Sequence, residues 1–307
     1  CNFYMPIFLE ALDAYGLPLE LRYLPIIESA LNPSAVSRAG ASGLWQFMIG
    51  TGKIYGLESN SLVDERRDPI KATWAAARYL KEMYDIYGDW NLVIAAYNCG
   101  PGTINKAIRR ANGETDYWKI YNYLPKETRG YVPAFIAANY VMTYYCDHNI
   151  CPMETNIPAS TDTVQVNKNL HFEQIADLCN VPLDQIKSLN PQYKKQMIPG
   201  DSKPYTLRLP IDAISTFIDK QDTIYAHRAD ELFRNRKTVA IKEITPSTRK
   251  TTTAVAGKGK LTYYTIKSGD TLSTIAGKYG VSVKDIQRWN GMSNTKIAAG
   301  KRLKIYK

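Results

Sequence analysis

The sequence has few of the residues that bind metal ions in proteins. Its three histidines are scattered (His148, His171 and His227), and its five cysteines form no CxxC pair. Structural zinc sites need clustered cysteine and histidine ligands. We therefore expect no metal site, and no motif in the chain calls for a cofactor.

Long apolar runs are absent as well. No stretch reaches the roughly 18 apolar residues that a transmembrane helix needs. The chain starts at Cys1 without a basic and then apolar leader, so either a signal segment has been removed or the sequence has been trimmed. A cysteine in first position is typical of a lipid-modified terminus. Because Cys1 runs into an expected helix without a tether, we favour trimming.

Two cysteines stand close together in the sequence. Cys146 and Cys151 flank the residues DHNI, which are expected to form a turn. A short-loop disulfide is possible in an oxidising compartment, and two free thiols are an equally good interpretation.

The net charge of +10 is unevenly distributed. Residues 1–150 hold 14 Lys and Arg against 15 Asp and Glu, a net charge of −1, which leaves 25 against 14, or +11, for residues 151–307. A basic second half indicates an anionic partner, such as nucleic acid, an anionic membrane or an anionic cell-wall polymer. No recognition motif accompanies the charge, so we expect no nucleic-acid binding.

The length of 307 residues favours two or more folded units, and the mean hydropathy of −0.32 is ordinary for a soluble globular chain. Apolar residues recur at helical spacing in the first half, and no strand-like alternation appears there. Residues 1–152 therefore read as an all-α domain. Its expected helices cover two segments within 2–23 and then 24–30, 44–50, 69–87, 90–97, 103–111 and 133–145.

The second half contains an internal repeat. Residues 164–190 and 264–290 share one pattern at an offset of 100, with Asn190 matching Asn290. Each copy ends in a short apolar strand, so each is predicted to be a small βααβ module of about 45 residues. We assign the modules to residues 162–210 and 261–307. Between them, residues 211–260 read as a connector that continues into a flexible, basic, Thr- and Lys-rich linker.

Glu28 stands out in the first half because apolar residues surround it. The side chains of residues 25–27 and 30–31 are all apolar. Desolvation raises the pKa of a carboxyl group, and a raised pKa allows proton donation near neutrality. The plainer alternative is a helix-end carboxylate paired with Arg22 or Arg38.

Four motifs, in this order, resemble the soluble-type lytic transglycosylases, which share a fold with goose-type lysozyme, and the match is best to the membrane-bound transglycosylase D branch. They are IIESALNPSAVSRAGASGLWQFM (26–48), RRDPIKATWAAARYL (66–80), GDWNLVIAAYNCGPG (88–102) and ETRGYVP (127–133). The two repeats resemble LysM modules, which bind glycans that contain N-acetylglucosamine. The first copy is degenerate, because Asn167, Lys168 and Asn169 replace the SGD turn of the second.

The resemblance implies cleavage of the β-1,4 bond between N-acetylmuramic acid and N-acetylglucosamine in peptidoglycan, with 1,6-anhydromuramoyl ends as products. Glu28 is then the sole catalytic acid and base. Most glycosidases use two carboxylates that flank the bond. No second acid lies near the Glu28 motif, since Glu20 precedes it and none follows until Glu58. This absence fits a reaction in which a hydroxyl of the substrate attacks.

The resemblance also assigns residues that bind substrate. In the helical domain they are Ser37, Gln46, Met48, Tyr97, Asn98 and Tyr131. In the second LysM module the loops that carry Gly269, Asp270, Thr271, Gly291 and Met292 are expected to contact glycan. The expected enzyme is a monomer of the bacterial cell envelope, periplasmic or attached to the outer membrane, and its partner is peptidoglycan. A lysozyme-type hydrolase and a non-catalytic glycan-binding scaffold are the alternatives.

Overall fold

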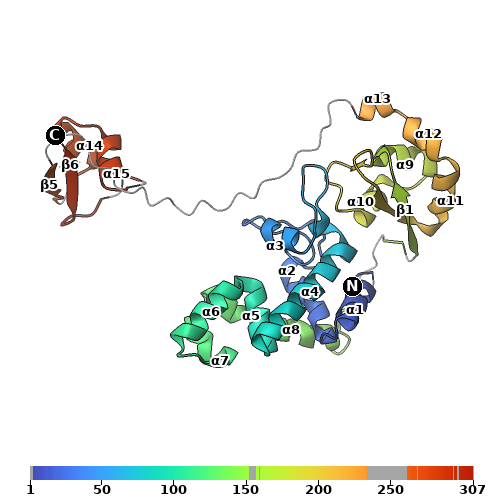
Figure 1. Ribbon diagram of the computed structural model, residues 1–307, viewed down its shortest axis with the longest axis horizontal. Coiled ribbons are helices and arrows are strands. Elements are labelled where there is room, and N and C mark those ends of the chain that lie inside the picture. Colours follow the sequence, from blue (N-terminus) through green and yellow to red (C-terminus); the bar gives the residue numbers. More distant parts are fainter. Residues whose placement is uncertain are drawn as a thin grey trace. The chain divides into compact units, whose positions relative to one another are not determined.

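The computed structural model describes residues 3–151, 157–158, 160–233, 261–267, 269–292, 294–295 and 297–306. Cys1 and the expected linker at 235–260 lie outside these residues. The chain divides into two compact units, residues 1–243 and 244–307, which are drawn together in Figure 1 and described here one at a time.

The first unit begins with the helical domain. Its elements are α1 (Met5–Ala14), η1 (Leu19–Tyr23), α2 (Leu24–Ser29), α3 (Ile49–Ile54), η2 (Glu65–Arg67), α4 (Pro69–Tyr87), α5 (Trp90–Cys99), α6 (Pro101–Arg110), α7 (Tyr117–Ile120), η3 (Tyr121–Tyr123) and α8 (Lys126–Thr143). Helix α4 is the central element of the domain (Figure 1) and packs against both α1 and α5. The expected all-α domain is confirmed.

Helix α4 has the ends that its sequence predicts. The Asp68 side chain accepts hydrogen bonds from the backbone N–H groups of Ile70 and Lys71, and Pro69 occupies the first turn. At the other end Gly88 adopts a left-handed conformation with φ +62°, which glycine permits at low cost. Both signals are local in the sequence, so they can be read from the sequence alone.

Helix α8 begins earlier than expected. We predicted a start at Pro133, but the helix starts at Lys126 and Pro133 lies inside it. A proline lacks the N–H that would bond to the carbonyl four residues earlier, here Arg129. The Tyr117 hydroxyl donates to that carbonyl at 3.0 Å. A side chain from α7 therefore replaces the missing backbone donor and allows the helix to continue.

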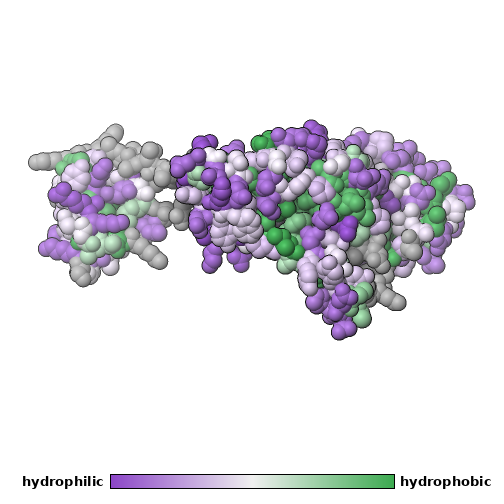
Figure 2. Space-filling model, turned by 90° about the horizontal axis from the view of Figure 1, so that it is seen from below, coloured by the Kyte–Doolittle hydropathy of each residue, from purple (hydrophilic) through white to green (hydrophobic). Residues whose placement is uncertain are grey.

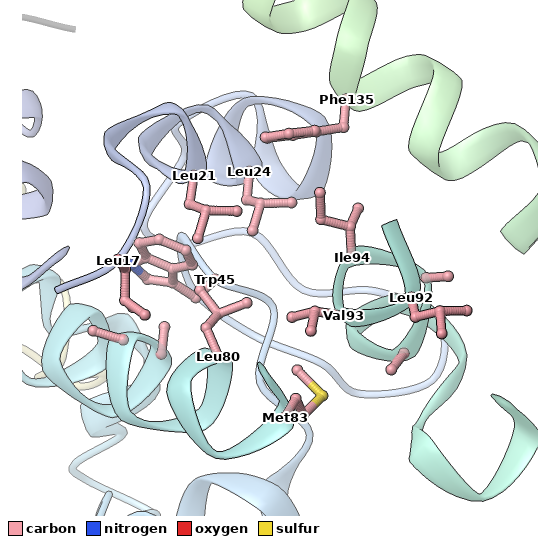
Figure 3. Packing of buried hydrophobic residues seen from close by; sticks show 14 of the residues in the cluster. Leu17, Leu21, Leu24, Trp45, Leu80, Met83, Leu92, Val93, Ile94 and Phe135 are labelled. Carbon is pink, nitrogen blue, oxygen red and sulfur yellow. The ribbon is translucent and has the colours of Figure 1, made fainter. Parts of the chain in front are cut away.

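The core of the helical domain surrounds an indole ring. Trp45 is fully buried and lies between leucines of η1, α2 and α4, with Leu21, Leu24 and Leu80 around it (Figure 3). Its Nε1–H donates to the Thr73 hydroxyl at 2.9 Å, so the one polar atom of the ring has a partner. Trp45 is thus a core residue, which fixes the segment that surrounds it.

The rest of the first unit is the first LysM-like module. It contains β1 (Thr161–Val166), β2 (Asn169–His171), α9 (Phe172–Cys179), α10 (Leu183–Leu189), β3 (Met197–Pro199), β4 (Tyr205–Pro210), α11 (Ile211–Asp219), α12 (Gln221–Ala226) and α13 (Ala229–Leu232). Strands β1 and β4 pair antiparallel, from Thr161 opposite Pro210 to Val166 opposite Tyr205. The additional ladder β2–β3 was not expected from the βααβ pattern.

Part of the expected connector folds onto this module. Residues 211–232 form α11 to α13, and Ala213, Phe217 and Ile224 are buried in the same apolar cluster as β1 and β4. The Gln174 amide nitrogen on α9 donates to the backbone oxygens of Tyr225 and His227. The module therefore extends beyond residue 210.

The second unit is the C-terminal LysM module. Strands β5 (Leu261–Thr265) and β6 (Arg302–Tyr306) pair antiparallel around α14 (Leu272–Tyr279) and α15 (Val283–Trp289), which confirms the βααβ prediction. The two modules also share equivalent side-chain hydrogen bonds. Asn190 bridges Ile186 and Arg208, and Asn290 bridges Ile286 and Lys304, each with a side-chain amide that both donates and accepts.

Hydrophilic side chains cover much of the visible surface of both units (Figure 2). Among the described helices, none combines the length and the apolarity that a membrane span requires. Cys146 and Cys151 are both exposed free thiols, so the possible disulfide is not formed.

Candidate active site

Glu28 lies at the C-terminal end of the short helix α2 and is half-buried. The chain turns sharply after it, because Ala30 and Leu31 both have positive φ angles, +50° and +60°. Ser29 holds this turn in place: its hydroxyl is within 2.9 Å of the backbone oxygens of both Pro25 and Leu44. Contacts of the Ser29 hydroxyl therefore anchor the turn that follows the catalytic candidate.

Three surrounding effects set the pKa of Glu28, which is raised to about 7. Burial contributes most, since it disfavours the charged form. The hydrogen bond from the Tyr131 hydroxyl on α8 opposes it, because that bond stabilises the carboxylate. The negative charge of Glu127, also on α8, raises the pKa further. A carboxyl group with this pKa is protonated in a useful fraction near neutrality and can act as a general acid.

The alternative in which Glu28 pairs with Arg22 does not hold. The Arg22 guanidinium donates to the Tyr23 hydroxyl at 2.8 Å and lies over the Tyr23 ring. A neighbouring cation would lower the pKa of Glu28, whereas the pKa is raised.

Glu127 is the acidic residue that sequence reasoning missed. The sequence contains no second carboxylate in the residues near Glu28. The structure brings an exposed carboxylate from α8 within electrostatic range of Glu28 across 99 positions of sequence. The ETRGYVP motif contains Glu127 and could have identified it, since Tyr131 of the same motif was already expected at the substrate site.

The two predicted tyrosines lie near the Glu28 carboxylate, and each comes from a different helix. Tyr131 on α8 donates its hydroxyl hydrogen to Glu28 Oε1. Tyr97 on α5 donates to the backbone oxygen of Trp45 at 2.7 Å, and its pKa is raised well above 10.0 by burial first and by the Glu28 charge second. Both rings therefore line the site of the acid.

Asn98 is held by its neighbour on α8. Its side-chain oxygen accepts a hydrogen bond from the Thr128 hydroxyl at 2.8 Å. Thr128 is buried in the first turn of α8, immediately after Glu127 in the sequence. This bond therefore connects α5 to the start of α8. Tyr97 and Asn98 thus lie on the helix end that faces the residues of the ETRGYVP motif.

The remaining predicted residues lie on one loop, residues 37–48, which we call the active-site loop. Ser37 is exposed and its hydroxyl oxygen accepts from the backbone N–H of Ala41 at 3.0 Å. Gln46 has a φ of +46°, and its amide nitrogen donates to the backbone oxygen of Gly43 at 2.8 Å. Met48 is half-buried and immediately precedes α3. A helix was expected from Leu44, but positive φ values at Gly43 and Gln46 prevent one there.

In the C-terminal module the predicted residues lie in two segments, one before α14 and one after α15. Met292 lines a groove of about 420 Å³ together with Ile266, Ile297 and Arg302. Gly269, Asp270 and Thr271 form the turn before α14, where the Asp270 carboxylate accepts from the Tyr264 hydroxyl and the Lys267 backbone, and Thr271 caps the helix. Gly291, at φ +63°, follows α15.

Comparison with known proteins gives the domains their families. Residues 6–120 match the transglycosylase SLT domain, residues 160–226 the LysM-like domain of lytic transglycosylase MltD, and residues 264–305 the LysM domain. By these matches the chain is similar to lytic transglycosylases of the D branch. The lysozyme-like helical domain and the LysM modules expected from the sequence are confirmed.

Individual relatives are similar to different parts of the chain. The membrane-bound lytic murein transglycosylase D of Escherichia coli is 33% identical over 296 residues, which cover 94% of this chain and 60% of that protein. The chain therefore spans less than two thirds of this relative. An autolysin of Enterococcus faecalis is 55% identical over 49 residues, 16% of this chain and 7% of its own length. The solved 70-kDa soluble lytic transglycosylase of Escherichia coli aligns with a TM-score of 0.40 and 29% identity, over 46% of this chain and 24% of that one.

Among the described residues, no group of three or more His, Cys, Asp or Glu side chains could hold a metal ion.

Proposed function

We propose that the chain is a peptidoglycan lytic transglycosylase that cleaves the bond between N-acetylmuramic acid and N-acetylglucosamine and leaves 1,6-anhydromuramoyl ends. The observation that carries the proposal is the half-buried Glu28 with its pKa raised to about 7. The match of residues 6–120 to the SLT domain supports the reaction class.

In this reaction Glu28 acts twice. As an acid it donates its proton to the glycosidic oxygen, and the bond between that oxygen and C1 of the muramic acid breaks. As a base it then accepts the proton of the sugar's own 6-hydroxyl as that oxygen bonds to C1. The pKa near 7 suits both steps, because the acid and the base forms are each populated near neutral pH.

The neighbouring residues would hold the sugars. Tyr97 and Tyr131 offer ring faces for stacking and hydroxyls for hydrogen bonding. We assign Ser37, Gln46, Met48 and Asn98 to further substrate contacts. In the C-terminal module we assign glycan binding to the groove that Met292 lines and to the turns at 269–271 and 291.

Replacement of the acid tests the proposal. Glu28→Gln should abolish the clearing of purified cell walls while the protein still sediments with them. Glu20→Gln, at an exposed glutamate of the same domain, is the matched control and should keep full activity. If Glu28→Gln still cleared walls, Glu28 would not be the acid.

A second candidate is hydrolysis by water, as in lysozymes. Glu127 favours it, because a second carboxylate near the acid is what most hydrolysing glycosidases require. Mass spectrometry of the released fragments separates the two reactions, since anhydro ends are lighter by one water than reducing ends. Reducing ends alone would refute the transglycosylase reaction.

We further propose that the enzyme is monomeric and works in the bacterial cell envelope, in the periplasm or attached to the outer membrane. The relative from Escherichia coli is named as membrane-bound. Fractionation of cells that express the full natural gene would test this location, and recovery in the cytosol would contradict it.

A further inference from the structure

The segment between α3 and α4 connects the helical domain to the first LysM-like module. We call residues 58–67 the docking loop. Its Leu62 and Val63 are 5% and 0% exposed and belong to the apolar cluster of the LysM-like module, not to that of the helical domain. Two side chains of one domain are therefore core residues of the next.

Backbone hydrogen bonds fix this contact. The Asp64 N–H donates to the Gln192 oxygen at 2.9 Å, and the Lys194 N–H donates to the Leu62 oxygen at 2.8 Å. Val63 pairs with Tyr193 as an isolated antiparallel bridge. The docking loop thus forms an isolated antiparallel bridge with residues 192–194, and its backbone hydrogen bonds define the register of the contact.

Further bonds join the module to Glu58 at the start of the docking loop. The Tyr205 hydroxyl on β4 lies 3.0 Å from both carboxylate oxygens of Glu58, and Lys203 Nζ lies 2.7 Å from one of them. Burial and the Glu58 charge raise the pKa of Tyr205, so the hydroxyl remains a donor. The Lys203 ammonium is half-exposed, so its own contribution is small.

The other end of the docking loop holds the active-site loop. Arg66 donates from Nε and Nη2 to the two carboxylate oxygens of Asp64, at 2.9 and 2.8 Å. Its Nη1 donates to the backbone oxygens of Gly40 and Phe47, both at 2.8 Å. Asp64 and Arg66 are 2% and 5% exposed, so the pair is costly to break and its fork geometry is well defined.

Close packing leaves this loop little freedom. A Cβ at Gly43 would lie 1.7 Å from the Arg66 backbone oxygen, and Gly43 has a φ of +89°. The active-site loop is joined in turn to the acid and its neighbours, through Ser29 to Leu44 and through Tyr97 to Trp45. A continuous set of hydrogen bonds therefore runs from the LysM-like module to the residues around Glu28.

In the first module, the segments that correspond to the expected glycan-binding turns of the second module make other contacts. Residues 169–171 correspond to 269–271, but they form β2 and pair with β3, and Gly200 packs on the Lys168 backbone with no room for a Cβ. Residues 191–194 correspond to 291–294, but they carry the bonds to the docking loop. Both segments that we expect to contact glycan in the second module are thus engaged within the first unit.

From these contacts we propose that the first LysM-like module is a positioning domain for the active site, with Asp64 and Arg66 as positioning residues, and that it does not hold glycan. The effect on catalysis rests on the function proposed above, whereas the effect on the active-site loop does not.

Two substitutions test the proposal from its two ends. Arg66→Lys keeps the charge but removes the fork that bonds Asp64 and two carbonyls together. Val63→Ala keeps the backbone bonds but shortens the side chain that is inserted in the module. The matched controls are Arg228→Lys, in an ion-pair network of the same module with Asp177 and Glu231, and Val166→Ala, equally buried in the same apolar cluster.

Hydrogen exchange of the full chain is the first measurement. The amides of Ala41, Ser42 and Gly43 are bonded within or beside the active-site loop. Both test variants should raise their exchange rates, by about tenfold for Arg66→Lys, and both controls should leave them within about twofold. Unchanged exchange in both test variants would overturn the proposal, even if their melting temperatures fell.

Kinetics on soluble glycan strands are the second measurement. Displacement of the groups that orient substrate lowers kcat, here by about tenfold for Arg66→Lys, with KM within about twofold. Sedimentation with cell walls should be unchanged in every variant. Weaker sedimentation of Val63→Ala than of Val166→Ala would contradict our proposal that the first LysM-like module does not bind glycan. If the natural protein released no anhydro ends, the proposed function would fail, and the exchange rates would still test the positioning.

Discussion

The pKa of Glu28 offers a test in which two neighbouring substitutions should act in opposite directions. Tyr131→Phe removes the hydroxyl that donates to the carboxylate. A donor to the charged form lowers a pKa, so its loss should raise the pKa of Glu28 above about 7. Glu127→Gln removes a negative charge that raises the pKa, so its loss should lower it.

The two magnitudes differ because the two groups differ in exposure. A hydrogen bond to a charged group contributes about 1.5–3 kcal/mol, which corresponds to about one to two pH units. Glu127 is exposed, and interactions of exposed charges are worth about 0.2–1 kcal/mol, which corresponds to about 0.7 of a pH unit at most. We therefore expect a large upward shift for Tyr131→Phe and a small downward shift for Glu127→Gln.

The assay is the pH dependence of kcat/KM on soluble glycan strands. The protonated carboxyl is the active acid, so activity should fall as pH rises through the pKa of Glu28, near 7 in the natural protein. The measured quantity is the pH at which kcat/KM falls, because the maximum value of kcat/KM also changes if Tyr131 contacts substrate. Tyr140→Phe, at an exposed tyrosine of the same helix, is the control. Shifts of both test variants in the same direction would refute the assignment of causes.

Three further predictions follow from the described contacts. Glu28→Gln should stabilise the protein at pH 8 by up to about 3 kcal/mol and have no such effect at pH 4, because the pKa of Glu28 is about 7 in the folded state and 4.5 in the unfolded state, so its ionisation costs stability as pH rises between these values. Urea unfolding at both pH values measures this effect, and an equal effect at pH 4 would contradict the prediction. Tyr117→Phe should lower the free energy of unfolding by about 1–2 kcal/mol, since it leaves the Arg129 carbonyl without its donor, and unchanged stability in thermal unfolding would contradict our account of Pro133. Met292→Asp should weaken sedimentation with cell walls while kcat on soluble strands is kept, and a loss of kcat would argue against independent modules.

Much of the fold could be predicted because its signals are local. Helix α4 follows from the cap at Asp68 and the glycine at 88, and the repeat from residues that recur at an offset of 100. The start of α8 could not be read in the same way, because a tyrosine of another helix provides the donor that Pro133 removes. The docking of the first module was equally hidden, since it pairs the loop at 58–67 with residues 192–205.

The candidate site was predictable where a motif carried it. Glu28, Tyr97 and Tyr131 are brought together as expected. The catalytic and substrate-binding roles of these residues stay predictions until the variants are measured. Glu127 was missed because proximity along the chain is a poor guide to proximity in a helical domain, where α2 and α8 pack together across about a hundred positions.

The electrostatics of Glu28 bear directly on the choice between ring closure and hydrolysis. Burial alone would raise its pKa, so a raised pKa does not by itself require a second carboxylate. If Glu127 activated a water, Glu127→Gln should abolish the release of reducing ends and lower kcat by orders of magnitude. If the sugar's own hydroxyl is the nucleophile, the same variant should retain anhydro products and change only the position of the pH limb. The product analysis and the pH profile of this one variant therefore distinguish an electrostatic neighbour from a catalytic partner.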